Sequence, residues 1–118
     1  MSGVADALRE VDRADARVIA HLQSVDFTLD YVRDDVASEY SDRDLDEAYH
    51  LIMGHLVAGD NFRNLIGEDV CHAQALFFDD VVVFVLPSER YEAVFASFDR
   101  HEAFPTTEVI ETAADARV

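Results

Sequence analysis

The sequence predicts an α+β fold, in which an antiparallel sheet of about five strands carries a long helix packed on one face. Three observations lead to this prediction. Residues 25–31 alternate between apolar and polar side chains, as a half-buried strand does. Residues 42–58 show the three- and four-residue apolar spacing of an amphipathic helix. Residues 71–78 and 81–86 are two β-rich runs separated by two aspartates, which is typical of a hairpin.

The expected order of elements is α-β-β-α-β-β-β-α. The first helix is predicted over residues 3–12, where Val4, Leu8 and Val11 recur at helical spacing. Ser2 is a candidate N-cap, because a serine side chain accepts hydrogen bonds from the free backbone N–H groups of a first turn.

Residues 17–22 form an apolar run that allows two interpretations. The run pairs with the next strand as a hairpin, or it extends the first helix, and the pattern alone does not decide. In the strand over residues 25–31, the period of two places alternate side chains on the buried face. The residues expected to point inward are Val25, Phe27, Leu29 and Tyr31.

The long helix is predicted from its cap and its apolar stripe. Ser41 is a good N-cap, and the aspartates that follow it place negative charge where the helix dipole favours it. The stripe consists of Leu45, Ala48, Tyr49, Ile52, Met53 and Leu56. We expect the helix to end at Gly59, since glycine readily adopts the left-handed conformation that closes helices. Residues 62–66 allow one more turn before Gly67.

The hairpin is predicted to join residues 71–78 and 81–86 through a tight turn at Asp79-Asp80. Residues 81–86 are apolar on both faces, which indicates a central strand covered by helix.

Residues 91–98 again allow two interpretations. They fit a helix capped by Ser88, and they equally fit a third strand of a meander after a turn at residues 87–90. A short final helix is expected to begin at Thr106 or Thr107, and its apolar side chains are Val109, Ile110 and Ala113.

The charge balance is the strongest compositional signal. The 118 residues include 25 acidic against 9 basic ones, and the formal net charge is −16. At molar salt the Debye length falls to about 3 Å, so the resulting self-repulsion is largely screened. We therefore expect a halophilic protein. The same charge disfavours nucleic-acid binding, because a phosphate backbone would be repelled.

Length and composition indicate one cytoplasmic domain spanning residues 1–118. No stretch approaches the ~20 apolar residues needed to cross a membrane. The N-terminus lacks the basic start and apolar core of a signal peptide. Cys71 is the single cysteine, which excludes an internal disulfide and a multi-cysteine zinc site within one chain.

Three short stretches resemble a small family of uncharacterised proteins from halophilic archaea. They are Tyr31-Val32-Arg33-Asp34-Asp35-Val36, Tyr40-Ser41-Asp42 and Phe77-Phe78-Asp79-Asp80-Val81-Val82-Val83, with a helix of matching length between them. The resemblance extends over residues 17–100 and implies a strand at residues 91–98. It implies no established activity, cofactor or catalytic residue. The order of elements is also similar to that of roadblock-type and profilin-like domains, a likeness of fold alone.

The metal-binding patterns in the sequence are weak. Residues 42–46 alternate aspartates like the start of an EF-hand loop, but Glu47 occupies the glycine position and Met53 the final glutamate position. Helix capping and acidic solvation explain this segment better. His50 and His55 are five residues apart, which does not place them on one helical face. We therefore predict neither a metal site nor a cofactor.

Two further groups are candidates for chemistry. Cys71 becomes a nucleophile only if a histidine activates it, and no local signature indicates this. Cys71 and His72 are expected to point to opposite faces of a strand. Arg33, Asp34 and Asp35 follow the clearest strand and form the one candidate functional patch, although polar residues also simply terminate strands.

The leading hypothesis is a non-enzymatic protein-interaction or regulatory domain that forms a homodimer or binds another protein. It rests on the edges and faces that a small sheet leaves to be covered, and on an aromatic content that is high for so acidic a chain. The first alternative is a small-molecule-sensing domain, which requires a concave apolar pocket. The second is an enzyme or metal protein that uses Cys71 and the histidines.

Overall fold

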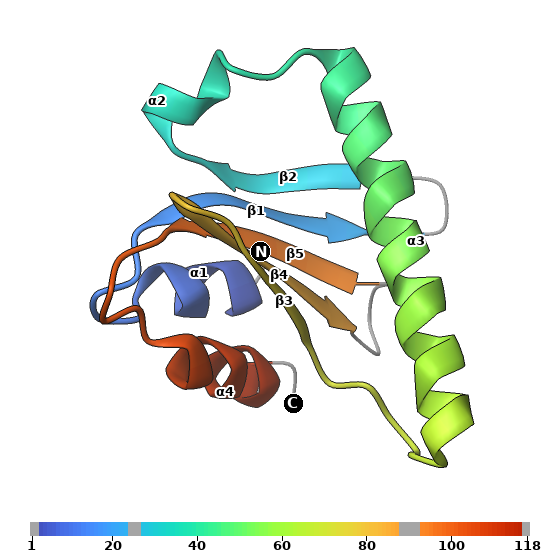
Figure 1. The fold of residues 1–118 in the computed structure, drawn as a ribbon. Helices are drawn as coiled ribbons and strands as arrows, with labels where there is room; N and C mark the ends of the chain where they lie inside the picture. Colours follow the sequence, from blue (N-terminus) through green and yellow to red (C-terminus); the bar gives the residue numbers. More distant parts are fainter. Residues whose placement is uncertain (1–2, 24–26, 88–92, 117–118) are drawn as a thin grey trace.

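The computed structural model describes residues 3–23, 27–87 and 93–116 (Figure 1). Its strands form one antiparallel sheet of five strands in the order β2-β1-β5-β4-β3. The elements are α1 (Gly3–Arg9), β1 (Ala16–Leu22), β2 (Phe27–Val32), α2 (Asp34–Ala37), α3 (Asp42–Ile66), β3 (Gln74–Phe77), β4 (Val81–Pro87), β5 (Ala93–Asp99) and α4 (Thr106–Ala116). The α+β class, the five-stranded sheet and the long helix are confirmed, and the short helix α2 is an addition to the expected order.

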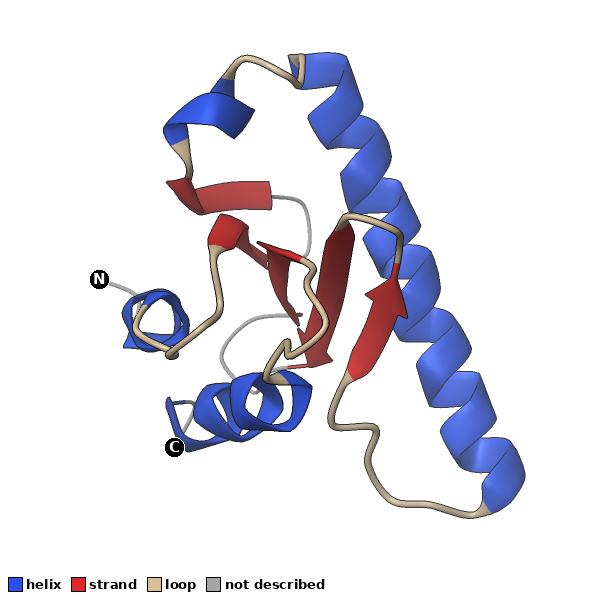
Figure 2. Cartoon of the chain, turned by 60° about the vertical axis from the view of Figure 1, so that its left-hand side comes forward, coloured by secondary structure: helices blue, strands red, loops and turns tan. Residues whose placement is uncertain are grey.

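The sheet lies between two helical layers, with α1 and α4 on one face and α3 on the other (Figure 2). The larger core fills the space between the sheet and α1 and α4, and its fully buried side chains include Leu8, Ile19, Phe84, Phe98 and Val109. Within the described ranges, no helix is both long enough and apolar enough to cross a membrane.

A smaller core lies under α3, which crosses one end of the sheet (Figure 1). It contains Leu22 from the end of β1, Ala93 from the start of β5, Val85 from β4 and Ile52 from α3. Ile52 is the one buried residue of the 25-residue helix. The remainder of this sheet face, toward the start of β4 and the end of β5, is therefore only partly covered.

The inward set predicted for β2 is wrong in part. Tyr31 pairs with Ile19 and Leu29 pairs with Ala20, so Asp30 is an extra residue in a β-bulge. Because a bulge reverses the alternation, Tyr31 packs with the α1 side of the sheet and Phe27 with the α3 side. Leu29 is 39% exposed. The predicted inward residue Val25 lies outside the described residues, as does the candidate cap Ser2.

Both open alternatives are decided in favour of strands. Residues 17–22 belong to β1, and α1 ends at Arg9, earlier than predicted. The run predicted over 91–98 is β5 from Ala93 onward, and it pairs with β1 on one side and β4 on the other. The helical interpretation is therefore wrong. Ser88 and Tyr91 lie outside the described residues.

The predicted cap of α3 is confirmed, the predicted end at Gly59 is wrong, and the further turn allowed over residues 62–66 before Gly67 is present. The Ser41 hydroxyl accepts from the Asp44 backbone N–H, and the Asp44 carboxylate accepts from the Ser41 N–H, which is a capping box. The helix passes Gly59 and ends at Gly67, whose φ of 77° is left-handed. Gly59 instead makes room for Gln74, whose Nε2 donates to the His55 carbonyl at 2.7 Å and would collide with a Cβ there.

The predicted hairpin is confirmed, closed by the Phe78 N–H donating to the Val81 carbonyl at 2.8 Å. Its first strand is shorter than predicted, so Cys71 and His72 lie in the loop before β3 and not on a strand. The final helix begins at Thr106 as expected.

Candidate functional site

Arg33 holds two carboxylates at the junction of β2 and α2. Its Nε donates to Asp35 at 2.6 Å, and its Nη1 donates to Asp99 at the end of β5 at 2.6 Å. The Arg33 backbone N–H also donates to the Arg17 carbonyl at 2.8 Å. Asp34, the third member of the predicted patch, is exposed at the start of α2. The structure therefore brings Arg33 together with Asp35 and Asp99, and not with Asp34.

These hydrogen bonds shift the pKa values of Arg33 and of the two carboxyl groups. Donation from Arg33 lowers the pKa of the Asp35 carboxyl and that of the Asp99 carboxyl, while the two carboxylates raise the pKa of Arg33. The guanidinium makes four hydrogen bonds to these two carboxylates with its five N–H groups, so Arg33 has little capacity left for a ligand. Its evident role is to fix the start of α2 on the sheet, and so to position the segment that leads into α3.

The histidines and Cys71 do not form one centre. His21 Nδ1 lies 2.8 Å from an Asp30 oxygen, and the His101 ring hydrogen-bonds the Arg13 carbonyl at 2.8 Å. The Cys71 thiol donates a long hydrogen bond of 3.8 Å to the Ala73 carbonyl. No cluster of three histidine, cysteine, aspartate or glutamate side chains suited to a metal ion occurs in the described part of the chain.

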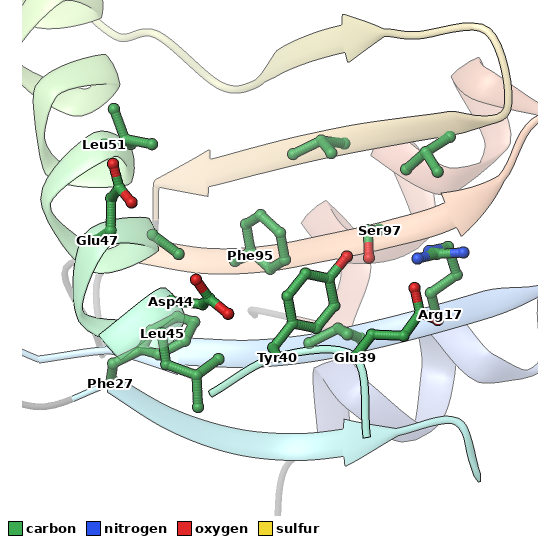
Figure 3. Close-up of a pocket in the computed structure, with 14 residues that line it drawn as sticks. Arg17, Phe27, Glu39, Tyr40, Asp44, Leu45, Glu47, Leu51, Phe95 and Ser97 are labelled. Carbon is green, nitrogen blue, oxygen red and sulfur yellow. The ribbon is translucent and has the colours of Figure 1, made fainter. Parts of the chain in front are cut away.

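A cavity of about 390 Å³ lies on the partly covered sheet face (Figure 3). The sheet forms its floor, the first half of α3 forms one wall, and the segment between α2 and α3 lies over it. Its apolar lining consists of Val18, Phe27, Leu45, Ala48, Leu51, Val81, Val83 and Phe95. This volume and composition are typical of small-molecule sites.

The polar groups of the cavity fall at two ends. Asp44 and Glu47 line the end beside α3, and Arg17, Glu39 and Ser97 line the other, with Phe95 between them in Figure 3. The Tyr40 ring lies over the space between the two ends (Figure 3).

Ser97 is the unusual member of the lining. It is 5% exposed, and its hydroxyl has no hydrogen-bond partner among the described residues. Figure 3 shows the hydroxyl directed into the cavity. Among the described residues no buried polar side-chain atom lacks a partner, so water in the cavity reaches the Ser97 hydroxyl, and a bound polar group would replace that water. The sequence contains one signal that could have indicated this residue, which is a serine at an inward position of an otherwise apolar strand.

The second half of α3 exposes a different apolar surface. Leu51 is 62%, Phe62 61% and Leu65 79% exposed. A second hollow of about 390 Å³ runs beside them and is lined by residues that include Ala58, Phe62, Ile66, Val70 and Cys71. We call the side chains Leu51, Ala58, Phe62 and Leu65 the α3 stripe.

The fold and its cavity define an α+β domain whose sheet is fully covered on one face and partly covered on the other. The chain belongs to the family described as Domain of unknown function (DUF7522), whose model matches residues 2–117. No curated protein and no solved structure matches it.

Proposed function

We propose that this chain is a non-enzymatic interaction or regulatory domain of a salt-rich cytoplasm, and that a second copy of the chain covers the α3 stripe. The observation that carries the proposal is the exposure of large apolar side chains along one side of α3. Contiguous exposed apolar surface of this kind marks interaction sites on proteins.

The α3 stripe has the spacing of one helical face. Leu51, Ala58, Phe62 and Leu65 are separated by seven, four and three residues, so their side chains project from the same side of the helix. The segment from residue 51 to residue 66 is about 24 Å long at the usual helical rise. Two such stripes pack against each other as an antiparallel helix pair, which is the self-complementary contact of a two-fold dimer.

The distribution of charge along α3 favours contact between two copies of the chain at the α3 stripe. Between residues 51 and 66 the charged side chains are Asp60 and Arg63, which pair at 2.7 Å, so the segment is neutral in a chain of net charge −16. The first six residues of α3 carry four acidic side chains and one basic one. Interface centres are depleted of charge. Two acidic copies therefore meet with least repulsion at the α3 stripe.

The experiment is size-exclusion chromatography with light scattering in several-molar KCl. The unmodified chain is expected to be a dimer, and Phe62→Glu a monomer, because the substitution places a charge in the contact. Phe78→Glu is the matched control, since Phe78 is 54% exposed but lies in the β3–β4 turn. A monomeric unmodified chain, or equal dissociation by both substitutions, would overturn the proposal.

A second candidate function is small-molecule sensing. The cavity beside α3 is the concave apolar pocket that this function requires. The third candidate, a metal protein or enzyme built on Cys71 and the histidines, has no comparable geometric support in the described residues.

A further inference from the structure

We infer that the cavity between α3 and the sheet binds a small apolar molecule that carries a cationic amine at one end and a neutral hydrogen-bonding oxygen at the other. The inference gives the sensing candidate a site and a ligand class. It shares Leu51 with the α3 stripe but is tested by separate measurements.

The neutral oxygen belongs at the Ser97 end. The Ser97 side chain lines the cavity, and its hydroxyl has no hydrogen-bond partner among the described residues (Figure 3). Arg17 and Glu39 line the same end with opposite charges, and Arg17 also lies 3.6 Å from the Asp99 carboxylate. A hydroxyl or carbonyl oxygen satisfies Ser97 without introducing an unbalanced charge.

The amine belongs at the α3 end. Asp44 and Glu47 line that end, and no basic residue lines the cavity beside them. One Asp44 oxygen accepts from the Ser41 N–H at 2.9 Å, which holds this carboxylate in place. The net charge of −16 adds a long-range field that attracts cations and repels anions.

The body of the ligand is apolar. Phe95 lies between the two polar ends, and Val83, Leu45 and Leu51 contribute further apolar lining. The Tyr40 ring lies over the same space and offers an aromatic face to an aromatic or cationic group. A single aromatic ring with a short arm is small compared with about 390 Å³.

The test uses four probes that share one aromatic ring. Tyramine carries both polar groups, phenethylamine lacks the hydroxyl, 4-ethylphenol lacks the amine, and 3-(4-hydroxyphenyl)propanoate replaces the amine by a carboxylate. Affinities are measured by titration calorimetry or by NMR shifts, at the lowest KCl concentration that keeps the circular dichroism spectrum of the folded protein. Tyramine is expected to bind most tightly and the carboxylate probe least tightly.

Two variants test which polar group of the ligand binds at which end of the cavity. Ser97→Ala is expected to lower tyramine affinity about three- to tenfold and to leave phenethylamine nearly unchanged, as loss of one hydrogen bond implies. Glu47→Gln is expected to lower tyramine affinity up to about fivefold and to leave 4-ethylphenol unchanged. Asp46→Asn is the matched control, because Asp46 lies next to Glu47 on α3 but does not line the cavity.

Three results would overturn the inference. The first is that no probe saturates the protein, or that the carboxylate probe binds as tightly as tyramine. The second is that Ser97→Ala lowers the affinities of tyramine and phenethylamine equally. The third is that tyramine binds only to the Phe62→Glu monomer, since the partner chain would then occupy the cavity. Because light scattering reports the oligomeric state separately, failure here leaves the dimer proposal untouched.

Discussion

The guanidinium of Arg33 donates to the carboxylate of Asp99, 66 positions further along the chain, at 2.6 Å. Arg17 lies 3.6 Å from the same carboxylate. Asp99 thereby ties the end of the central strand β5 to the start of β1 and to the entrance of α2. These contacts determine where the segment over the cavity begins.

Replacement of Asp99 by Asn is expected to lower the free energy of unfolding by about 1 kcal/mol at neutral pH, a figure that already allows for solvent screening of this partly exposed group. Urea titration measures the change. Asp34→Asn is the control, because the exposed Asp34 side chain makes no hydrogen bond or ion pair within the described residues. Equal losses in the two variants would contradict the assigned role of Asp99.

The Asp99→Asn effect is expected to depend on pH. Arg33 lowers the pKa of the folded Asp99 carboxyl below its ordinary value of 3.8. The folded state therefore binds fewer protons than the unfolded chain, so the stabilisation is present above pH 3.8 and is lost as the pH falls through the folded pKa. Urea titrations at a series of pH values give the free energies of unfolding of the unmodified protein and of Asp99→Asn, and the two free energies should converge at acidic pH. A difference that stays constant down to low pH would count against this account.

The glycines of α3 are expected to respond differently to alanine. At Gly54 no atom outside the adjacent residues and the backbone of the helix lies within 4 Å of the position that an added methyl group would take, so Gly54→Ala should stabilise the protein by about 1 kcal/mol through helix propensity. Gly59→Ala displaces the Gln74 amide from the His55 carbonyl, which offsets about 0.5–1.5 kcal/mol of that gain. Thermal or urea unfolding of both variants gives the difference. Equal stabilisation would show that Gln74 relocates without loss.

The capping box at the start of α3 is expected to contribute measurably. Ser41→Ala removes the acceptor for the Asp44 N–H and should cost about 1 kcal/mol. Ser38→Ala, at the exposed end of α2, should cost much less. The comparison is made by urea unfolding at one KCl concentration, and similar losses would refute a specific role for the cap.

The melting temperature is expected to rise with KCl concentration. A net charge of −16 repels itself in dilute buffer, and salt shortens the range of that repulsion. Circular dichroism melting curves at increasing KCl test this directly. A melting temperature that falls as salt is added would refute adaptation to high salt.

The spacing of apolar residues predicted the fold class, because most helices and strands bury one face against a neighbouring layer and leave the other face polar. Alternation revealed the strands, and the three-four spacing revealed α3, including its cap at Ser41. The inward set of β2 was wrong because one inserted residue, Asp30, reverses the alternation without changing composition. The predicted helix end at Gly59 was wrong because the reason for a glycine there is Gln74, fifteen positions away in the chain.

The cavity was beyond prediction for a similar reason. Its floor comes from β1, β4 and β5, and its wall comes from α3, so no local pattern contains it. Glu39 and Tyr40 lie close to the Arg33 patch in sequence, but nothing local indicates that they border a cavity. The patch itself stands out by its charges, and in the structure Arg33 and Asp35 satisfy each other.

The position of β5 has a consequence for how the chain folds during synthesis. Ala16 in the first strand pairs with Phe98 in the last, and β5 also pairs with β4, so β5 joins the two hairpins. Until residue 99 has left the ribosome, each hairpin lacks its main neighbour, and a two-stranded ribbon is barely stable alone. We therefore expect nascent chains to stay open until β5 has emerged, and then to fold in one step that is slowed by contacts distant in sequence.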